Sequence, residues 1–299
     1  MNLYFLLFYF IIYAFLGWCT EVVYAAVNTG RFVNRGFLNG PVCPVYGFGI
    51  AAIVAFLAPV SNNPALLFAG SALITSVIEL ITGWIMERAF HTRWWDYSAI
   101  PFNIGGYICL KFSIAWGIAC VMIMNIIHPV IQDIILKLDF RTGKVILSVA
   151  LAAISVDCVA TVQSVLKLNR QLKQINYLAS KIKALSDDIG QVLYSESISL
   201  MEKSEEVKTS FEEQKTSINE LLDEKKTEAE NSIVKLKSNL NERTSKLKSD
   251  RESYAEKLEN LMNNSFFGQK RLLKAFPNLK HANYTNDLEE LKKKIFKNK

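Results

Sequence analysis

The sequence has few of the residues from which catalytic and metal sites are usually built. It contains only three histidines, and none of its five cysteines forms a CxxC pair or lies at zinc-ligand spacing from a histidine. The patterns GxxxxGK[ST], GxSxG and HExxH do not occur, which argues against a P-loop ATPase, an α/β-hydrolase and a zincin. We therefore predict no metal site and no cofactor, and the sequence favours a non-enzyme over an enzyme.

Charged residues are scarce in the first half of the chain. Only 15 Asp, Glu, Lys and Arg residues precede residue 166, whereas 47 follow it. An apolar part and a charged part of this kind need different solvents, so we predict a transmembrane domain over residues 1–165 with the lipid bilayer as its partner. The net charge of +6 is diluted by 28 acidic residues, and we therefore expect no binding to nucleic acid.

The apolar half contains five segments of about the length that a helix needs to cross a bilayer, roughly 20 residues. Basic residues follow the first, third and fifth of them, and such residues favour the cytoplasmic side. We therefore predict an all-α, multi-pass helix bundle in the cell membrane, with its N-terminus outside and its C-terminal tail in the cytoplasm. The predicted spans are 3–27, 43–60, 65–86, 104–128 and 143–165.

The two predicted inner loops, 29–49 and 93–106, are rich in glycine and proline and also carry many apolar residues. Backbone without regular structure is tolerated at membrane depth only where protein or water satisfies its polar groups, so we predict re-entrant or interfacial loops. Each loop follows a span that carries a glutamate, Glu21 or Glu79. The two hairpins are either parallel repeats about an axis along the membrane normal or alike by chance.

Several polar residues of the spans and inner loops form a candidate site. An acidic residue at the centre of a membrane helix costs about 2.5–3.5 kcal/mol on insertion scales, so such residues need partners or a function. We expect a polar pocket near the inner face. Its candidate residues are Glu21, Asn34, Arg35, Asn39, Tyr46, Glu79, Glu87, Trp95, Asp96 and Asn103.

These polar groups could also have simpler roles. Lys111 could neutralise one of the acids of the spans, and Arg35 could pair with Glu21 or Asp96. Arg35 could also bind a phosphate or a lipid head group, or serve only to set the topology. Two converging carboxylates could perform acid/base chemistry.

The charged tail is predicted to be helical. Residues 166–262 contain no proline, and apolar residues such as Ile233, Leu240 and Leu247 recur every seven positions, which is typical of a coiled coil within the tail or between protomers. Residues 263–299 form a basic amphipathic segment that would lie on the anionic inner leaflet or pack against the coiled coil. We expect a homo-oligomer or another coiled-coil partner.

Four strings of residues resemble one known family. They are Gly17-Trp18 with Glu21, Asn34-Arg35-Gly36-Phe37-Leu38 with Gly40-Pro41, Pro44-Val45-Tyr46-Gly47, and Trp94-Trp95-Asp96-Tyr97-Ser98 with Pro101-Phe102-Asn103. Over about residues 1–160 the chain resembles the ABC-transporter permease family, type IV group, of bacterial multi-pass membrane proteins. The resemblance implies a permease in a bacterial membrane, and it brings with it no substrate and no catalytic residue.

These observations lead to three hypotheses on function. The first is a transporter-like membrane component that depends on a separate ATPase subunit, because the chain has no P-loop of its own. The second is a membrane-anchored coiled-coil scaffold or sensor, in which the tail matters most. The third is an intramembrane lipid-modifying enzyme.

Overall fold

The computed structural model describes residues 2–213 and 219–297. Two compact units make up the chain: the first joins Met1–Leu172 to Ser265–Lys299, and the second is Lys173–Asn264. The first unit holds the apolar helices and the last residues of the chain. The second unit holds most of the charged tail.

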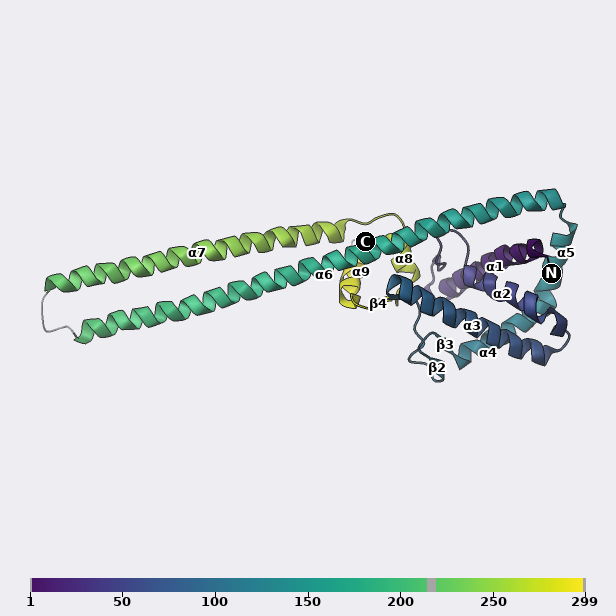
Figure 1. Ribbon diagram of the computed structural model, residues 1–299, viewed down its shortest axis with the longest axis horizontal. Helices are drawn as coiled ribbons and strands as arrows, with labels where there is room; N and C mark the ends of the chain where they lie inside the picture. The colour runs from purple at the N-terminus through teal and green to yellow at the C-terminus, as the bar shows by residue number, and fades with distance from the viewer. Residues whose placement is uncertain (1, 214–218, 298–299) are drawn as a thin grey trace. The chain divides into compact units, whose positions relative to one another are not determined.

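The first unit is a bundle of apolar helices (Figure 1). Its helices are α1 (Leu3–Thr29), α2 (Pro44–Leu57) with the short 3-10 helix η1 (Ala58–Val60), α3 (Pro64–Phe90), α4 (Leu110–Met122), the π-helical turn η2 (Ile123–Ile127), α5 (His128–Lys137) and the start of α6 (Phe140–Glu213). Among the described residues, four helices are long and apolar enough to cross a membrane, and Pro44–Val60 is a shorter apolar helix. The predicted all-α membrane bundle is confirmed.

The fourth apolar helix differs from its predicted bounds of 104–128. It begins later, at Leu110, because the preceding residues form a small β-hairpin, and it continues through α5 to Lys137. Pro129 lies in the first turn of α5, directly after the π-helical turn. A proline inside a regular α-helix clashes with the preceding turn, and the wider π-helical turn relieves this clash, so the chain stays helical where the sequence predicts a loop.

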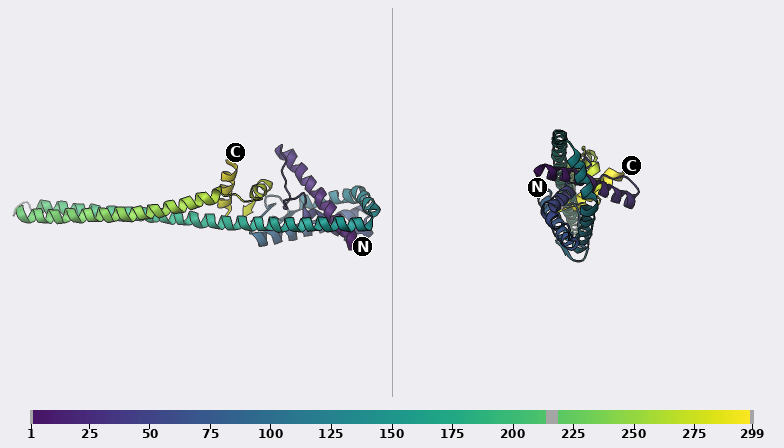
Figure 2. Two further views of the ribbon diagram at one scale, coloured as in Figure 1. Left: turned by 90° about the horizontal axis from the view of Figure 1, so that it is seen from above. Right: turned by 90° about the vertical axis from the view of Figure 1, so that its right-hand side faces the viewer.

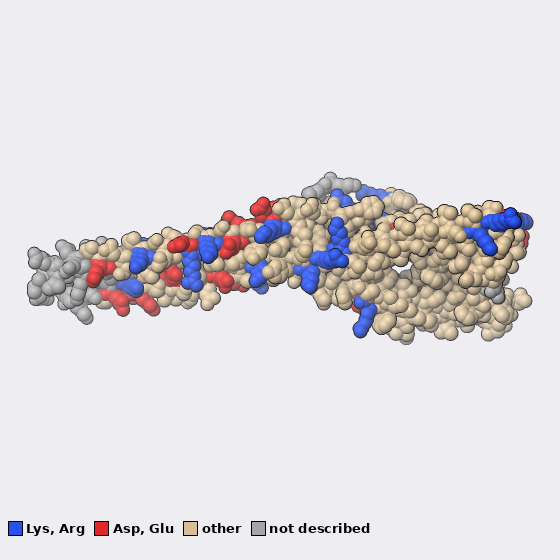
Figure 3. All heavy atoms as spheres, turned by 45° about the horizontal axis from the view of Figure 1, so that its top comes forward, with Lys and Arg blue, Asp and Glu red and all other residues tan. Residues whose placement is uncertain are grey.

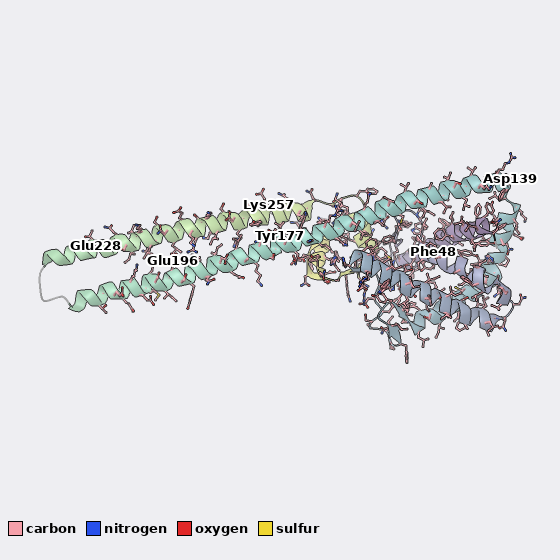
Figure 4. All side chains as sticks on the ribbon, viewed as in Figure 1. Phe48, Asp139, Tyr177, Glu196, Glu228 and Lys257 are labelled. Carbon is pink, nitrogen blue, oxygen red and sulfur yellow. The ribbon has the colours of Figure 1, made fainter. Side chains whose placement is uncertain are left out.

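The turn into α6 is capped by one acidic side chain. The Asp139 carboxylate accepts hydrogen bonds from the backbone N–H groups of Arg141 and Thr142, each at 3.1 Å. Figure 4 shows Asp139 at this corner between α5 and α6. Ser, Thr, Asp and Asn commonly cap helix starts in this way because the first N–H groups of a helix have no partner within it.

Neighbouring helices of the bundle follow one another in space: α1 packs on α2, α2 on α3, and α3 on α4. The core lies between them. Its buried residues are Phe8, Tyr9, Tyr13, Ile50, Ile53, Val54, Leu67, Cys120, Met124, Ile131, Ile135 and Leu147. Many apolar side chains on the outer faces are exposed, including Phe48 at 59% (Figure 4), and the surface of the bundle carries few charges (Figure 3). Such a surface suits contact with lipid.

The two glycine- and proline-rich loops meet at one end of the bundle. The second loop carries the short strands β1 (Thr92–Arg93), β2 (Asn103–Ile104) and β3 (Ile108–Cys109), and β2 pairs with β3 in an antiparallel hairpin. The first loop contains no strand and joins α1 to α2.

Residues 265–297 return to this end of the bundle. They form α8 (Gln269–Ala275), β4 (Lys280–His281) and α9 (Thr285–Lys297), and β4 pairs antiparallel with β1. Five leucines of this segment, Leu272, Leu273, Leu279, Leu288 and Leu291, are at most 1% exposed in the first unit, whereas Phe267 is 84% exposed and Phe296 is 43% exposed. The leucines of the predicted amphipathic segment are therefore covered by the first unit, while Phe267 remains exposed.

The second unit is a pair of long helices. The part of α6 after Leu172 runs antiparallel to α7 (Asn219–Asn263), as two views show (Figure 1, Figure 2). Ile189 on α6 and Thr244 on α7 are buried in this unit, at 9% and 6% exposure. Acidic and basic side chains alternate along its surface (Figure 3). A regular coiled-coil packing of the two helices stays a prediction.

Candidate functional site

Asn34 organises the first loop. Its side-chain oxygen accepts a hydrogen bond from the Trp18 indole at 2.7 Å and another from the backbone N–H of Gly36 at 3.1 Å. Its amide nitrogen donates to the carbonyl oxygen of Asn39 at 2.8 Å. One side chain therefore satisfies the backbone of a turn that has no regular structure, and this turn holds Arg35.

Glu21, Arg35 and Tyr46 come together near the C-terminal end of α1. The Tyr46 hydroxyl donates to Glu21 Oε1 at 2.6 Å, and Arg35 Nε lies 3.5 Å from Glu21 Oε2. The Arg35 guanidinium also lies 5.3 Å from the centre of the Tyr24 ring, within the range of a cation–π contact. Of the roles predicted for Arg35, pairing with Glu21 is the one that these contacts support.

Glu79 has a similar partner, but no lysine or arginine among the described residues forms an ion pair with it. The Tyr97 hydroxyl donates to Glu79 Oε1 at 3.1 Å, while Glu79 Oε2 is buried and has no hydrogen-bond partner among the described residues. Burial, followed by the Glu79 carboxylate, raises the pKa of Tyr97 well above its ordinary value, so this hydroxyl stays a hydrogen-bond donor.

Electrostatic interactions link these two carboxylate sites. After burial, Glu79 and Cys109, the charge of Glu21 adds to the rise in the pKa of the Tyr97 hydroxyl. The structure therefore brings the two predicted span glutamates into one neighbourhood. We call Glu21, Arg35, Tyr46, Glu79 and Tyr97 the polar cluster.

Glu87 and Asp96 belong to a second network, centred on Arg93. Arg93 Nε donates to Glu87 at 2.8 Å, and Arg93 Nη1 lies 3.5 Å from Asp96. The Lys280 ammonium donates to the other oxygen of Asp96 at 2.9 Å. Hydrogen bonds from Ser98 and then from Lys280 hold the pKa of Asp96 well below its usual range. These two predicted site residues thus have cations of their own.

Asn103 and Trp95 support the backbone of the second loop. The Asn103 amide donates to the Ile100 carbonyl at 2.7 Å, and its oxygen accepts from the N–H of Gly106 at 3.1 Å. The Trp95 indole donates to the carbonyl of Tyr107 at 2.8 Å. Asn103 therefore has the same role in the second loop that Asn34 has in the first.

Asn39 leads to a residue that the predicted site did not include. Its backbone N–H and its side-chain amide donate to Asp157 Oδ1 at 3.1 and 2.9 Å, and the N–H of Gly40 donates to Asp157 Oδ2 at 2.7 Å. The Asn39 amide also donates to Thr161 at 2.9 Å. Asp157 lies on α6, and the one signal for it in the sequence is a carboxylate inside an apolar segment, which needs a partner.

One other predicted contact, an ion pair of Lys111, is not made. Lys111 is exposed and forms no ion pair with an acid in the part of the chain that the structure describes. Within that same part, no group of three or more His, Cys, Asp and Glu side chains is arranged to hold a metal ion. The carboxylates at this end of the bundle instead contact arginine, lysine, tyrosine and backbone N–H groups.

Comparison with known proteins gives one match. Residues 8–162 match a protein family described as "Putative ABC-transporter type IV", which covers more than half of the chain. No curated protein and no solved structure matches the chain. The matched residues contain the polar cluster, both loops and Asp157, and they end before the charged tail and the C-terminal segment.

Proposed function

Because the chain belongs to this ABC-transporter type IV family, we propose that it is the membrane component of a bacterial transporter and that the polar cluster contacts the substrate. The family and the apolar helices make it a transporter-like membrane protein. The proposal adds the site, a cytoplasmic position for the loops and the tail, and an N-terminus outside the cell. Basic residues near the loops and the start of the tail support this orientation.

The observation that carries the proposal is the open oxygen of Glu79. A buried carboxylate without a cation or a full set of donors is costly, and such groups in membrane proteins commonly mark the path of a substrate or an ion. Other carboxylates at this end are better satisfied. Glu21 has Arg35, Glu87 has Arg93, Asp96 has Lys280, and Asp157 has the N–H groups of Asn39 and Gly40. Glu79 thus remains free to accept from a substrate that donates a hydrogen bond or carries a positive charge.

A transport assay on mixtures tests this proposal even though the substrate is not identified. Inverted membrane vesicles that contain the protein are incubated with a cell extract, and the retained compounds are compared with those of empty vesicles by mass spectrometry. Glu79→Gln removes the charge but keeps the size of the side chain, and we expect it to lower the retention of specific compounds about tenfold or more.

Asp133→Asn is the matched control, because Asp133 is an exposed acid on α5. It should retain compounds as the wild type does. Unchanged retention in Glu79→Gln would remove Glu79 from the site, and no difference between wild type and empty vesicles would contradict transport itself.

A separate ATPase subunit is part of the proposal, since the sequence contains no GxxxxGK[ST] pattern. Purification of the tagged protein from its native membranes in mild detergent, followed by mass spectrometry, should identify a nucleotide-binding protein in stoichiometric amount. Recovery of only the protein itself or of cell-envelope proteins would count against this partner.

A scaffold or sensor is the second candidate, and the charged helix pair favours it because this unit lies outside the residues that match the family. The structure suggests how to separate the two candidates. Gln171 precedes the charged helix pair in the chain and Gln269 follows it, and their side chains are joined by a hydrogen bond of 2.6 Å. Because the two ends of the helix pair are therefore close together, residues 173–264 can be replaced by a short Gly-Ser linker. Retained transport in this variant would support the transporter, and loss of all function without loss of membrane insertion would support the scaffold or sensor.

A further inference from the structure

The C-terminal segment contacts both loops of the candidate site, although it lies more than one hundred residues beyond the residues that match the family. We call residues 265–297 the C-terminal clasp. The clasp is anchored on α6 by the hydrogen bond between Gln269 and Gln171, whose side chains are both buried. A hydrogen bond between two buried amides is costly to break, because both groups lose a partner that water cannot replace.

Arg271 of the clasp holds the first loop by its backbone. Its Nη1 atom donates to the Gly36 carbonyl at 2.8 Å, and its Nη2 atom donates to the next carbonyl, that of Phe37, at 2.9 Å. Burial lowers the pKa of Arg271, and the charge of Asp157 opposes this effect. An arginine remains protonated in either case, so a partly buried cation is directed at two consecutive carbonyl groups.

Asp157 holds the same peptide from its other end. It accepts the N–H groups of Asn39 and Gly40. Residues 36–40 therefore lie between a cation on the carbonyl groups and an anion on the N–H groups. Charge-assisted hydrogen bonds of this kind are about twice as strong as neutral ones, and together they define the backbone of a loop that has no regular structure.

The position of this peptide matters for the polar cluster. Arg35 directly precedes it, and the distance of 3.5 Å from Arg35 to Glu21 depends on where the loop backbone lies. A shift of about 1 Å in that backbone would separate the two charges or bring them closer.

The clasp holds the second loop as well. Its strand β4 pairs with β1, and Lys280 donates to Asp96. Trp94 of the second loop contacts Phe37 of the first loop and Phe276 of the clasp, with ring centres 5.1 and 4.8 Å apart. The two loops and the clasp thus share one packed contact.

We propose that Arg271 is a positioning residue of the candidate site: through the carbonyl groups of Gly36 and Phe37 it sets the place of Arg35 beside Glu21. What this site does for the cell rests on the proposed function, whereas the positioning itself does not. The inference adds to the site a residue from outside the family-matched part of the chain.

Hydrogen exchange of the full-length protein in lipid nanodiscs tests this inference. Arg271→Gln removes the charge, and we expect amide exchange at residues 36–40 to become about tenfold faster or more, because opening of the loop then costs less free energy. Exchange in the core of α2, at residues 50–54, should not change. Arg271→Lys keeps the charge but cannot donate from two fixed nitrogens, so we expect a partial effect.

Lys270→Gln is the matched control, because Lys270 is an exposed cation on the same helix. It should leave exchange at residues 36–40 unchanged. Unchanged exchange there in Arg271→Gln would overturn the inference, and so would faster exchange throughout the bundle, which would indicate a general role in stability.

A double variant separates positioning from packing. Asp157→Asn is made in the wild-type protein and in the Arg271→Gln variant. If Arg271 and Asp157 hold one peptide, the factor by which Asp157→Asn increases exchange at residues 36–40 should differ between these two backgrounds. Independent, multiplicative effects would contradict a shared clamp. Hydrogen exchange does not require a substrate, so its result is independent of the vesicle assay. Suppose that Arg271→Gln speeds exchange in the loop but Glu79→Gln does not change the retention of compounds. This outcome would refute the proposed function and leave the positioning role of Arg271 intact.

Discussion

The two hairpins of the bundle, α1 with α2 and α3 with α4, contain similar hydrogen bonds around a span glutamate but differ in the ion pair beside it. In each, a span glutamate accepts a hydrogen bond from a tyrosine hydroxyl, Tyr46 for Glu21 and Tyr97 for Glu79. In each, an asparagine side chain supports the turn of the loop. In the first hairpin, Arg35 forms an ion pair with Glu21. In the second hairpin, Glu79 Oε2 has no hydrogen-bond partner among the residues that the structure describes.

This difference teaches that a carboxylate in a span can have two physical roles. Glu21 is neutralised by a cation of its own loop, so it stabilises the local structure. Glu79 has the same hydrogen-bond donor without the cation, and this makes it the better candidate for contact with a substrate. In the sequence, both glutamates are candidate residues of one polar pocket.

Alanine substitutions at the closely packed glycines of the two hairpins should give the largest difference in the loss of stability. A side chain at Gly47 on α2 would overlap the backbone carbonyl of Phe10 on α1, whereas one at Gly117 on α4 would lie 2.8 Å from the Phe68 side chain on α3. Backbone cannot move aside as a side chain can. We expect Gly47→Ala to destabilise the protein by about 1–3 kcal/mol and Gly117→Ala by less, measured by thermal unfolding in detergent.

Gly49→Ala is the control for this experiment, because a side chain at Gly49 meets no atom within 4 Å. It should unfold at the wild-type temperature. Equal losses in Gly47→Ala and Gly117→Ala would show that the two helix contacts are equally tolerant.

Neutralising Glu21 should mainly lower the stability of the protein, whereas neutralising Glu79 should impair retention without lowering stability. Glu21→Gln leaves Arg35 without its carboxylate, so we expect a loss of about 1–2 kcal/mol in stability. Glu79→Gln leaves no cation behind and should unfold at the wild-type temperature or above it, even though it impairs retention in the vesicle assay.

Thermal unfolding of both variants measures this contrast. The double variant Glu21→Gln with Arg35→Met removes the unpaired cation and should recover part of the loss. A larger loss of stability in Glu79→Gln than in Glu21→Gln would reverse the roles that we assign to the hairpins.

The attachment of the clasp to the second loop should depend on pH more than its attachment to the first. His281 Nδ1 accepts the N–H groups of Asn283 and Tyr284, each at 3.2 Å, so the folded state needs a neutral ring. Burial, and then His91, lower the pKa of His281 from 6.5, while Asp287 opposes the shift. Since the unfolded segment binds a proton more readily, stability is complete above about pH 6.5 and is lost as the pH falls below it.

Hydrogen exchange between about pH 5 and 8, the range in which histidine titrates, tests this dependence after correction for intrinsic rates. Exchange at residues 282–284 should become faster below about pH 6.5, whereas residues 36–40, held by Arg271, should change less. His281→Asn keeps an acceptor near the position of Nδ1 and should abolish the dependence. An unchanged pH profile in His281→Asn would assign the effect to another group.

The smallest effect is expected at the surface of the second loop. Lys280 is 59% exposed, and Asp96 retains Arg93 when Lys280 is removed. We expect Lys280→Ala to cost no more than about 0.5 kcal/mol in thermal unfolding. A loss comparable to that of Glu21→Gln would mean that the ion pair of the clasp matters more than its exposure suggests.

The sequence alone determined the features that depend on local composition. Apolar length and sparse charge identify the membrane helices, and glycine and proline identify the two loops. Pairing of Glu21 with Arg35 was among the predicted alternatives. Residue strings in the first half also indicated the family that the comparison confirmed.

Only the tertiary structure decided the contacts between distant segments. Asp157 reaches Asn39 across 118 residues, and Arg271 reaches Gly36 across 235. The continuation of the fourth helix past Pro129 likewise depends on a π-helical turn that the sequence does not indicate. Hydropathy and spacing report on neighbours along one helix or strand, whereas the partner of a loop carbonyl depends on how whole helices pack. For that reason the sequence indicated which groups needed partners, and only the fold decided which partners they have.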